Sequence, residues 1–174
     1  FDSLSISQFK KDLKKKREKE INFVGTFDKD RLNIISSIKV KKKIYGGNWI
    51  KFNKTKIEKD VFFGPHIYGK DIFELMNKSA ISLNILRRQN YSAHNMRTFE
   101  IPANNGLMLT TRSNEQNKFF RENKACFMFS TKKELNKKIR FILQNPKKAE
   151  KVRKFGNYLV KKHTYINRIK FLLK

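Results

Sequence analysis

The sequence has a single cysteine, Cys126, among its 174 residues. One cysteine can form neither an intramolecular disulfide nor a cysteine-based zinc cluster. The sequence also lacks any apolar run close to the ~20 residues that a membrane-spanning helix needs, and no secretory signal peptide is visible. These absences indicate a cytoplasmic protein in a reducing compartment, with peripheral attachment to the inner face of the membrane as an alternative.

Acidic residues are also scarce: 15 Asp and Glu stand against 41 Lys and Arg, which gives a net charge of +26. Such an excess favours an anionic partner, either nucleic acid or a membrane surface. The lysines are nevertheless scattered along the whole chain, which is typical of solvated faces. A hydrophobic content of 39% and this length predict one folded domain. Because the chain begins with Phe1 rather than Met, we expect it to be part of a longer protein.

Short apolar segments alternate with stretches of helical periodicity. Residues 21–27, 80–86 and 106–110 have the composition of buried strands, and helical patterns separate them. This alternation predicts an α/β fold: a doubly wound parallel sheet of five or six strands with helices on both faces. The lysine-rich residues 1–20 lack such a pattern, so we expect a basic linker or N-terminal helix there and one domain over 21–174.

Capping residues mark several helix boundaries. Thr131 and Glu134 have the spacing of a capping box. Asn145 is expected to cap a helix that begins at Pro146. A helix start that contains Pro102 is expected after Glu100, before an apolar segment that reads as a strand.

Candidate site residues lie where two predicted strands end. Gly25 closes the first apolar segment, and a polar loop over 87–96 leaves the segment 80–86. Ligands of open parallel sheets bind at the carboxyl ends of the strands. The loop contains His94 and Asn95, which are therefore further candidates. For His94, a ligand-binding role and a solvated loop position both remain open.

The most specific motif is Arg97-Thr98-Phe99-Glu100-Ile101-Pro102-Ala103. It is preceded by Phe23-Val24-Gly25 and the segment 79–84, and followed by His163-Thr164-Tyr165. In this order the motifs resemble the C-terminal, donor-binding domain of CgeB-like (YkvP/CgeB) glycosyltransferases, which have the GT-B fold. The resemblance covers about residues 21–170. It implies a Rossmann-like domain that binds a nucleotide-sugar, and a whole enzyme that transfers the sugar to an unknown acceptor.

The resemblance also implies which partners the chain has. An N-terminal GT-B domain would supply the acceptor site, so the fragment alone is expected to be inactive. The nucleotide-sugar is a substrate, and neither a metal nor another cofactor is implied. An anionic membrane surface or a polysaccharide acceptor is compatible with this assignment, and no specific nucleic acid is expected. The alternative is a basic α/β module that binds nucleic acid without catalysis.

The resemblance implies roles for the residues near the strand ends but leaves the catalytic residues unknown. Glu100 would accept hydrogen bonds from the donor ribose, since a carboxylate offers acceptors only; the alternative is a carboxylate that stabilises a helix start. Arg31, beside Gly25, would pair two diphosphate oxygens, or be a surface arginine. Arg97 would reach the phosphates or brace the preceding loop. Trp49 would stack on a base or belong to the core.

Four further expectations follow. Ser92 stands eight positions before Glu100, so the glutamate pair of the large retaining GT-B family is absent. Asn105 takes the place of a glycine, because asparagine tolerates a left-handed helix stop. His163 is expected to be structural. Much of the positive charge should lie on exposed helix faces, with the strand-end cleft more basic than the opposite edge of the sheet.

Overall fold

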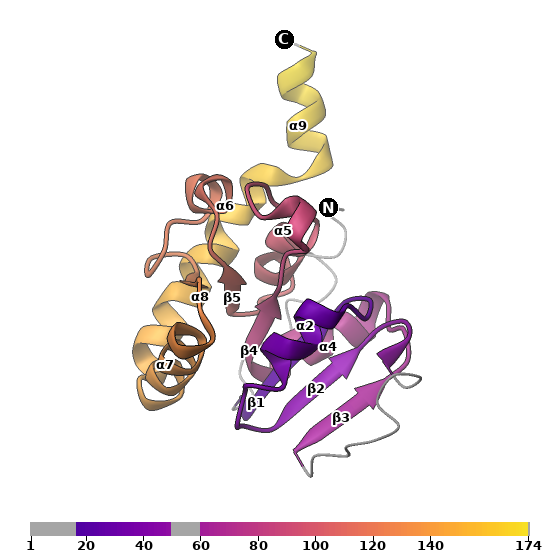
Figure 1. The fold of residues 1–174 in the computed structure, drawn as a ribbon. Helices are drawn as coiled ribbons and strands as arrows, with labels where there is room; N and C mark the ends of the chain where they lie inside the picture. Colours follow the sequence, from indigo (N-terminus) through magenta and orange to yellow (C-terminus); the bar gives the residue numbers. More distant parts are fainter. Residues whose placement is uncertain (1–16, 50–59, 174) are drawn as a thin grey trace.

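A computed structural model describes residues 17–49 and 60–173. These residues form a six-stranded sheet in the order β3-β2-β1-β4-β5-β6, shown in Figure 1. Neighbouring strands pair in parallel throughout. This confirms the predicted parallel sheet. The strands are β1 (Glu18–Val24), β2 (Lys42–Tyr45), β3 (Val61–Gly64), β4 (Ser79–Asn84), β5 (Met108–Thr111) and β6 (Phe127–Phe129).

Helices cover both faces of the sheet, as predicted. Successive residues of a strand point to opposite faces, and in β1 Phe23 belongs to one apolar cluster while Val24 belongs to another. The first cluster includes side chains of α2 and α7, and the second includes those of α4 and α5. The helices are α2 (Lys29–Ile35), α4 (Gly69–Lys78), α5 (Arg97–Ala103), α6 (Asn114–Phe119), α7 (Lys132–Gln144), α8 (Pro146–Val160) and α9 (Tyr165–Leu172), with 3₁₀ turns η2 (Arg88–Asn90) and η3 (Lys161–His163).

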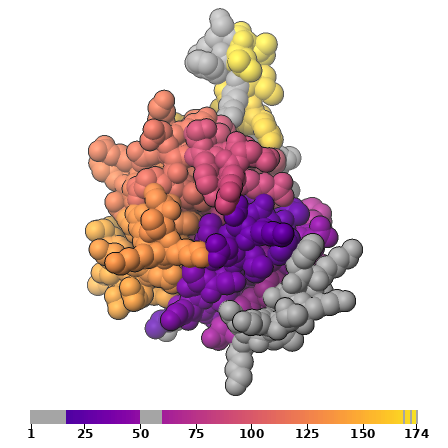
Figure 2. All heavy atoms as spheres, in the orientation of Figure 1, coloured from indigo at the N-terminus to yellow at the C-terminus, as the bar shows by residue number. Residues whose placement is uncertain are grey.

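Helices α2 and α7 lie side by side on the first face (Figures 1 and 2). The Asn136 side chain of α7 donates to the Ser37 carbonyl just beyond α2, at 3.1 Å. Helix α9 instead extends away from the body of the domain (Figure 1). Ile166, Ile169 and Leu172 of this helix are exposed.

Strand β1 begins at Glu18, three residues before the predicted position. Glu20 is buried and pairs with Lys43 Nζ of β2 at 2.9 Å. The hydrogen bond that Lys43 donates to the Glu20 carboxylate raises the pKa of Lys43. A charged residue thus occupies an inward position of a strand, which an apolar pattern does not reveal. Residues 1–16 of the predicted linker, and the connection over 50–59, lie outside the described residues.

The caps of the last helices differ in how well they were predicted. Thr131 accepts from the Glu134 amide at 3.1 Å, which confirms the capping residue of α7, while the Glu134 carboxylate accepts from the Ser130 amide at 2.8 Å. Asn145 takes the predicted N-cap position of α8, with Pro146 at the start of the helix. Its side chain makes no capping bond to α8 and donates instead to the Phe141 carbonyl of α7 at 2.9 Å.

The central motif forms a helix earlier than predicted. Helix α5 begins at Arg97, so Glu100 lies in its first turn and Pro102 lies near its end rather than at a helix start. Proline is tolerated there because its missing amide removes only one bond of a short helix. Asn105 has a φ of 58°, which confirms the left-handed stop.

Candidate functional site

An open hollow of about 540 Å³ lies at the carboxyl edge of the sheet. It unites the end of β1, the start of α2, the loop after β4 and the first turn of α5. Gly25, Arg31, Arg97 and Glu100, the four residues singled out from the sequence, all line it. The volume is in the range of small-molecule sites. The predicted convergence of these residues is therefore present, while their part in donor binding stays a prediction.

Gly25 is held tightly at the end of β1. Its amide donates to the Tyr45 carbonyl at 2.9 Å, and its carbonyl accepts from Trp49 Nε1 at 2.7 Å. Trp49 is buried and stacks on Phe63, so it belongs to the core rather than to a base-stacking surface. Gly46 approaches so closely that an added Cβ would lie 2.2 Å from the Gly25 carbonyl oxygen.

Arg31 is buried, and it bridges the ends of two strands. Its Nε and Nη2 donate to the Ile85 carbonyl at 3.1 and 2.9 Å, and its Nη1 donates to the Thr26 carbonyl at 3.0 Å. Burial, together with the neighbouring Arg87, lowers the pKa of Arg31. The surface-arginine alternative is therefore wrong. The guanidinium fixes the floor of the hollow and adds positive charge there.

Arg97 connects Glu100 to β1. Its Nε donates to the Val24 carbonyl at 3.2 Å, and its Nη1 donates to the Glu100 carboxylate, Oε2. Both side chains are half-buried at the edge of the hollow. Glu100 Oε1 has no hydrogen-bond donor among the described residues. The carboxylate is thus oriented through one oxygen, and its other oxygen remains available to a ligand.

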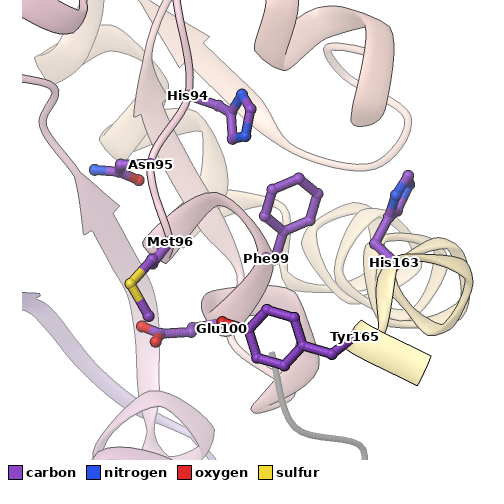
Figure 3. Close-up of a pocket in the computed structure, with 7 residues that line it drawn as sticks. All are labelled: His94, Asn95, Met96, Phe99, Glu100, His163 and Tyr165. Atoms are coloured by element: carbon purple, nitrogen blue, oxygen red, sulfur yellow. The ribbon is translucent and has the colours of Figure 1, made fainter. Parts of the chain in front are cut away.

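A second pocket of about 290 Å³ adjoins the hollow and shares Asn95, Met96 and Glu100 with it. Figure 3 shows the residues that line this second pocket. Its other lining residues are His94, Phe99, His163 and Tyr165. His163, which was expected to be structural, lines this pocket because the chain between α8 and α9 passes beside α5. Its ring lies 5.2 Å from that of Phe99.

His94 is held within this pocket by aromatic contacts. Its ring packs edge-to-face on Phe99 and Phe119, at 5.3 and 5.2 Å. Nδ1 lies 2.9 Å from Glu115 Oε1, but the approach does not have the angle of a hydrogen bond. His94 is therefore neither a freely solvated loop residue nor part of the larger hollow.

Asn95 holds the loop on the sheet through a buried polar network that the sequence did not reveal. Its Nδ2 donates to Asn84 Oδ1 at 3.0 Å, and its Oδ1 accepts from the Thr98 amide at 3.2 Å. Thr98 and Thr110 in turn donate to Gln116 Oε1, each at 2.9 Å. Satisfied buried networks of this kind rigidify a site.

Other lining residues of the hollow were missed: Thr26, Arg87 and Met96. Each lies within a predicted strand end or loop, but no motif in the sequence identifies it as a site residue. Three arginines, Arg31, Arg87 and Arg97, and one carboxylate, Glu100, therefore line the hollow.

The strand-end hollow was predicted to be more basic than the opposite edge of the sheet, and the opposite edge does not support this. A pocket of about 500 Å³ there is lined by Arg17, Lys19, Lys147 and Arg153 against one carboxylate, Glu150. The positive charge therefore does not single out the strand-end hollow.

Across residues 17–49 and 60–173, no three His, Cys, Asp or Glu side chains gather as a metal ion would require. The absence of a metal from the reaction stays a prediction. Within the same ranges, no helix has the length and apolar character needed to span a bilayer.

A sequence model described as "Glycosyl transferase-like" matches residues 20–174. The chain belongs to this glycosyl transferase-like family. No curated protein sequence matches it. The family assignment favours the predicted sugar-transfer function over the nucleic-acid-binding alternative, and the fold is that of a GT-B C-terminal domain.

Solved structures of glycosyltransferases resemble the domain. The C-terminal domain of a group 1 glycosyl transferase, LpcC, from Francisella tularensis is 13% identical, with a TM-score of 0.67 over 84% of this chain and 86% of that one. Anabaena HepE, solved with UDP, is 12% identical, with a TM-score of 0.68 over 99% and 53%. The β-glucosyltransferase of phage T4, solved with UDP-glucose, is 14% identical, with a TM-score of 0.66 over 86% and 45%. The chain thus spans about half the length of the last two proteins.

Proposed function

We propose that this glycosyl transferase-like domain is the donor-binding half of a CgeB-like glycosyltransferase that moves a sugar from a nucleotide-sugar to an acceptor. The observation that carries the proposal is the meeting of Gly25, Arg31, Arg97 and Glu100 on one hollow. The motif around Glu100 supports the CgeB-like assignment, and UDP or UDP-glucose in the similar structures supports the donor class.

The chemistry of the hollow suits a nucleoside diphosphate. Glu100 Oε1 would accept from the ribose hydroxyls, while the hydrogen bond from Arg97 holds the carboxylate in place. Arg97, Arg87 and the buried Arg31 would offset the charge of the diphosphate. Gly25 lacks a side chain, so its backbone leaves room for the phosphates.

The acceptor site would come from a second, N-terminal domain of a longer protein. The donor hollow and the exposed apolar side of α9 lie at one end of the domain, since Tyr165 of α9 lines the pocket that contains Glu100 (Figure 3). Ile166 and Ile169 are more than half exposed. A partner domain on this side would close the hollow from above and exclude water from the reaction.

Calorimetric titration of nucleosides, nucleoside monophosphates and nucleoside diphosphates into the protein tests the proposal. We expect saturable binding that strengthens from nucleoside to diphosphate and selects one base. A Glu74→Gln variant is the control for the loss of the Glu100 carboxylate, because Glu74 lies on α4 and does not line the hollow. Its affinity for the nucleotide should match that of the wild type. Binding that is the same for all nucleotides and for inorganic diphosphate would contradict a nucleotide site.

A further inference from the structure

The outer face of α8 and η3 carries two exposed aromatic rings. Phe155 and Tyr158 are 43% and 58% exposed, and their rings stack with centroids 6.2 Å apart and an interplanar angle of 21°. The opposite side of α8 is buried against the domain through Ala149, Val152, Gly156 and Val160. The rings are therefore not turned toward the core of the domain.

Exposed lysines flank this aromatic pair. Helical spacing places Lys151, Phe155 and Tyr158 along one line, which continues to Lys162 in η3. Lys161 is exposed beside them. We call Lys151, Phe155, Tyr158, Lys161 and Lys162 the Lys151–Lys162 face.

Acidic residues are sparse around this face. Glu150 is the last acidic residue of the sequence, and eight Lys and Arg residues follow it. The buried Arg153 engages Glu150. In the part of the chain that the structure describes, no carboxylate lies within 4.0 Å of the three lysines of the face. Helix α4 differs, since its Glu74 pairs with lysines on both sides.

We propose that the Lys151–Lys162 face docks the protein on an anionic lipid bilayer. Lysines at a negatively charged surface each contribute roughly 1 kcal/mol, and a helix face with basic and aromatic side chains can seat its rings at the headgroup level. Tyr158 suits that level because its ring is apolar and its hydroxyl remains in water. This surface is separate from the donor hollow, so the proposal does not depend on the proposed function.

The same charges could attract a nucleic acid, but the side chains favour lipid. The cations of the face are lysines, and Arg153, the arginine of α8, is buried; bidentate phosphate recognition prefers arginine. The stacking of Phe155 on Tyr158 also occupies one face of each ring, which leaves less ring surface to receive bases. A lipid interface needs neither bidentate contacts nor free ring faces.

Co-sedimentation with phosphatidylcholine vesicles, with and without phosphatidylserine, tests the proposal. We expect binding only when phosphatidylserine is present. The triple variant Lys151→Gln, Lys161→Gln, Lys162→Gln should weaken it on the order of 100-fold, and Phe155→Ser with Tyr158→Ser roughly tenfold. A matched variant, Lys39→Gln, Lys41→Gln, Lys124→Gln, removes three exposed lysines elsewhere and should bind much more tightly than the first triple variant.

Thermal unfolding of each variant shows whether it is folded, so a loss of binding can be assigned to the face. Equal weakening by the two triple variants would overturn the proposal, because binding would then follow net charge alone. Equal affinity for both kinds of vesicle would also overturn it. So would tighter binding to duplex DNA or RNA, at equal phosphate concentration, that depends on the same lysines.

Discussion

Arg97 joins Glu100 to the end of β1: its Nε donates to the Val24 carbonyl at 3.2 Å, and its Nη1 donates to the Glu100 carboxylate. The two residues lie three positions apart in the first turn of α5, so their side chains are neighbours on the helix surface. A cation that is itself anchored to the backbone therefore sets the direction of the carboxylate.

Replacing Arg97 should weaken nucleotide binding without unfolding the domain. An Arg97→Gln change removes a cation from the hollow and frees Glu100 to rotate, and we expect the affinity for a nucleoside diphosphate to fall roughly 10–100-fold. Calorimetric titration measures it. Arg88→Gln, which removes the partner of Asp30 on the exposed surface, is the control and should change affinity by much less. Equal effects would show that only bulk charge matters.

Replacing Arg31 should act chiefly on stability. Arg31→Met leaves the Ile85 and Thr26 carbonyls without their donors, and we expect a loss of about 2–4 kcal/mol in the free energy of unfolding. Urea denaturation measures this loss. Arg88→Met on the surface should cost about 0.5 kcal/mol or less. A similarly small loss for Arg31→Met would contradict its bridging role.

Gly46 is required by both its conformation and its surroundings. Its φ is +137°, and an added Cβ would lie 2.2 Å from the Gly25 carbonyl oxygen. We expect Gly46→Ala to cost roughly 3 kcal/mol or more. At Gly69, φ is +49° but no atom lies within 4 Å of the added Cβ, so Gly69→Ala should cost only about 1 kcal/mol. Thermal unfolding measures the loss of stability in each variant. A larger loss for Gly69→Ala than for Gly46→Ala would contradict this account.

Cys126 should resist thiol reagents. Burial, with a smaller effect of Glu122, raises the pKa of the thiol to about 12, so little thiolate exists near neutral pH. Alkylation by iodoacetamide should therefore follow unfolding of the domain. The folded state favours the protonated thiol, so this group's contribution to stability is complete below pH 9 and declines as the pH rises toward 12. Fast alkylation of the folded protein would contradict the burial.

The sheet could be predicted because its strands are short apolar segments separated by helical patterns. Residues 80–86 and 106–110 pair in parallel as β4 and β5, as the right-handed crossover rule requires. The exceptions are charged or polar residues inside the fold. Glu20 lies within β1 because Lys43 neutralises it, and Asn95 joins a buried network. Such partners meet across the fold, and one residue's type does not reveal the other.

The site could be predicted only in part, for the same reason. Gly25 and Glu100 follow strand ends, so topology alone brings them together. The burial of Arg31 depends on the Ile85 carbonyl, 54 residues away. The placement of His163 beside Phe99 depends on how the chain turns between α8 and α9. Neither position has a local signal in the sequence.

The central claim is that Glu100 recognises the ribose diol of the donor, and one comparison tests it directly. The affinities of the wild type and of Glu100→Gln are measured for a nucleoside diphosphate and its 2′-deoxy analogue. The wild type should prefer the ribose form by roughly 5–150-fold, the effect of about 1–3 kcal/mol, and this preference should largely vanish in Glu100→Gln. An equal preference in the two folded proteins would contradict the assignment.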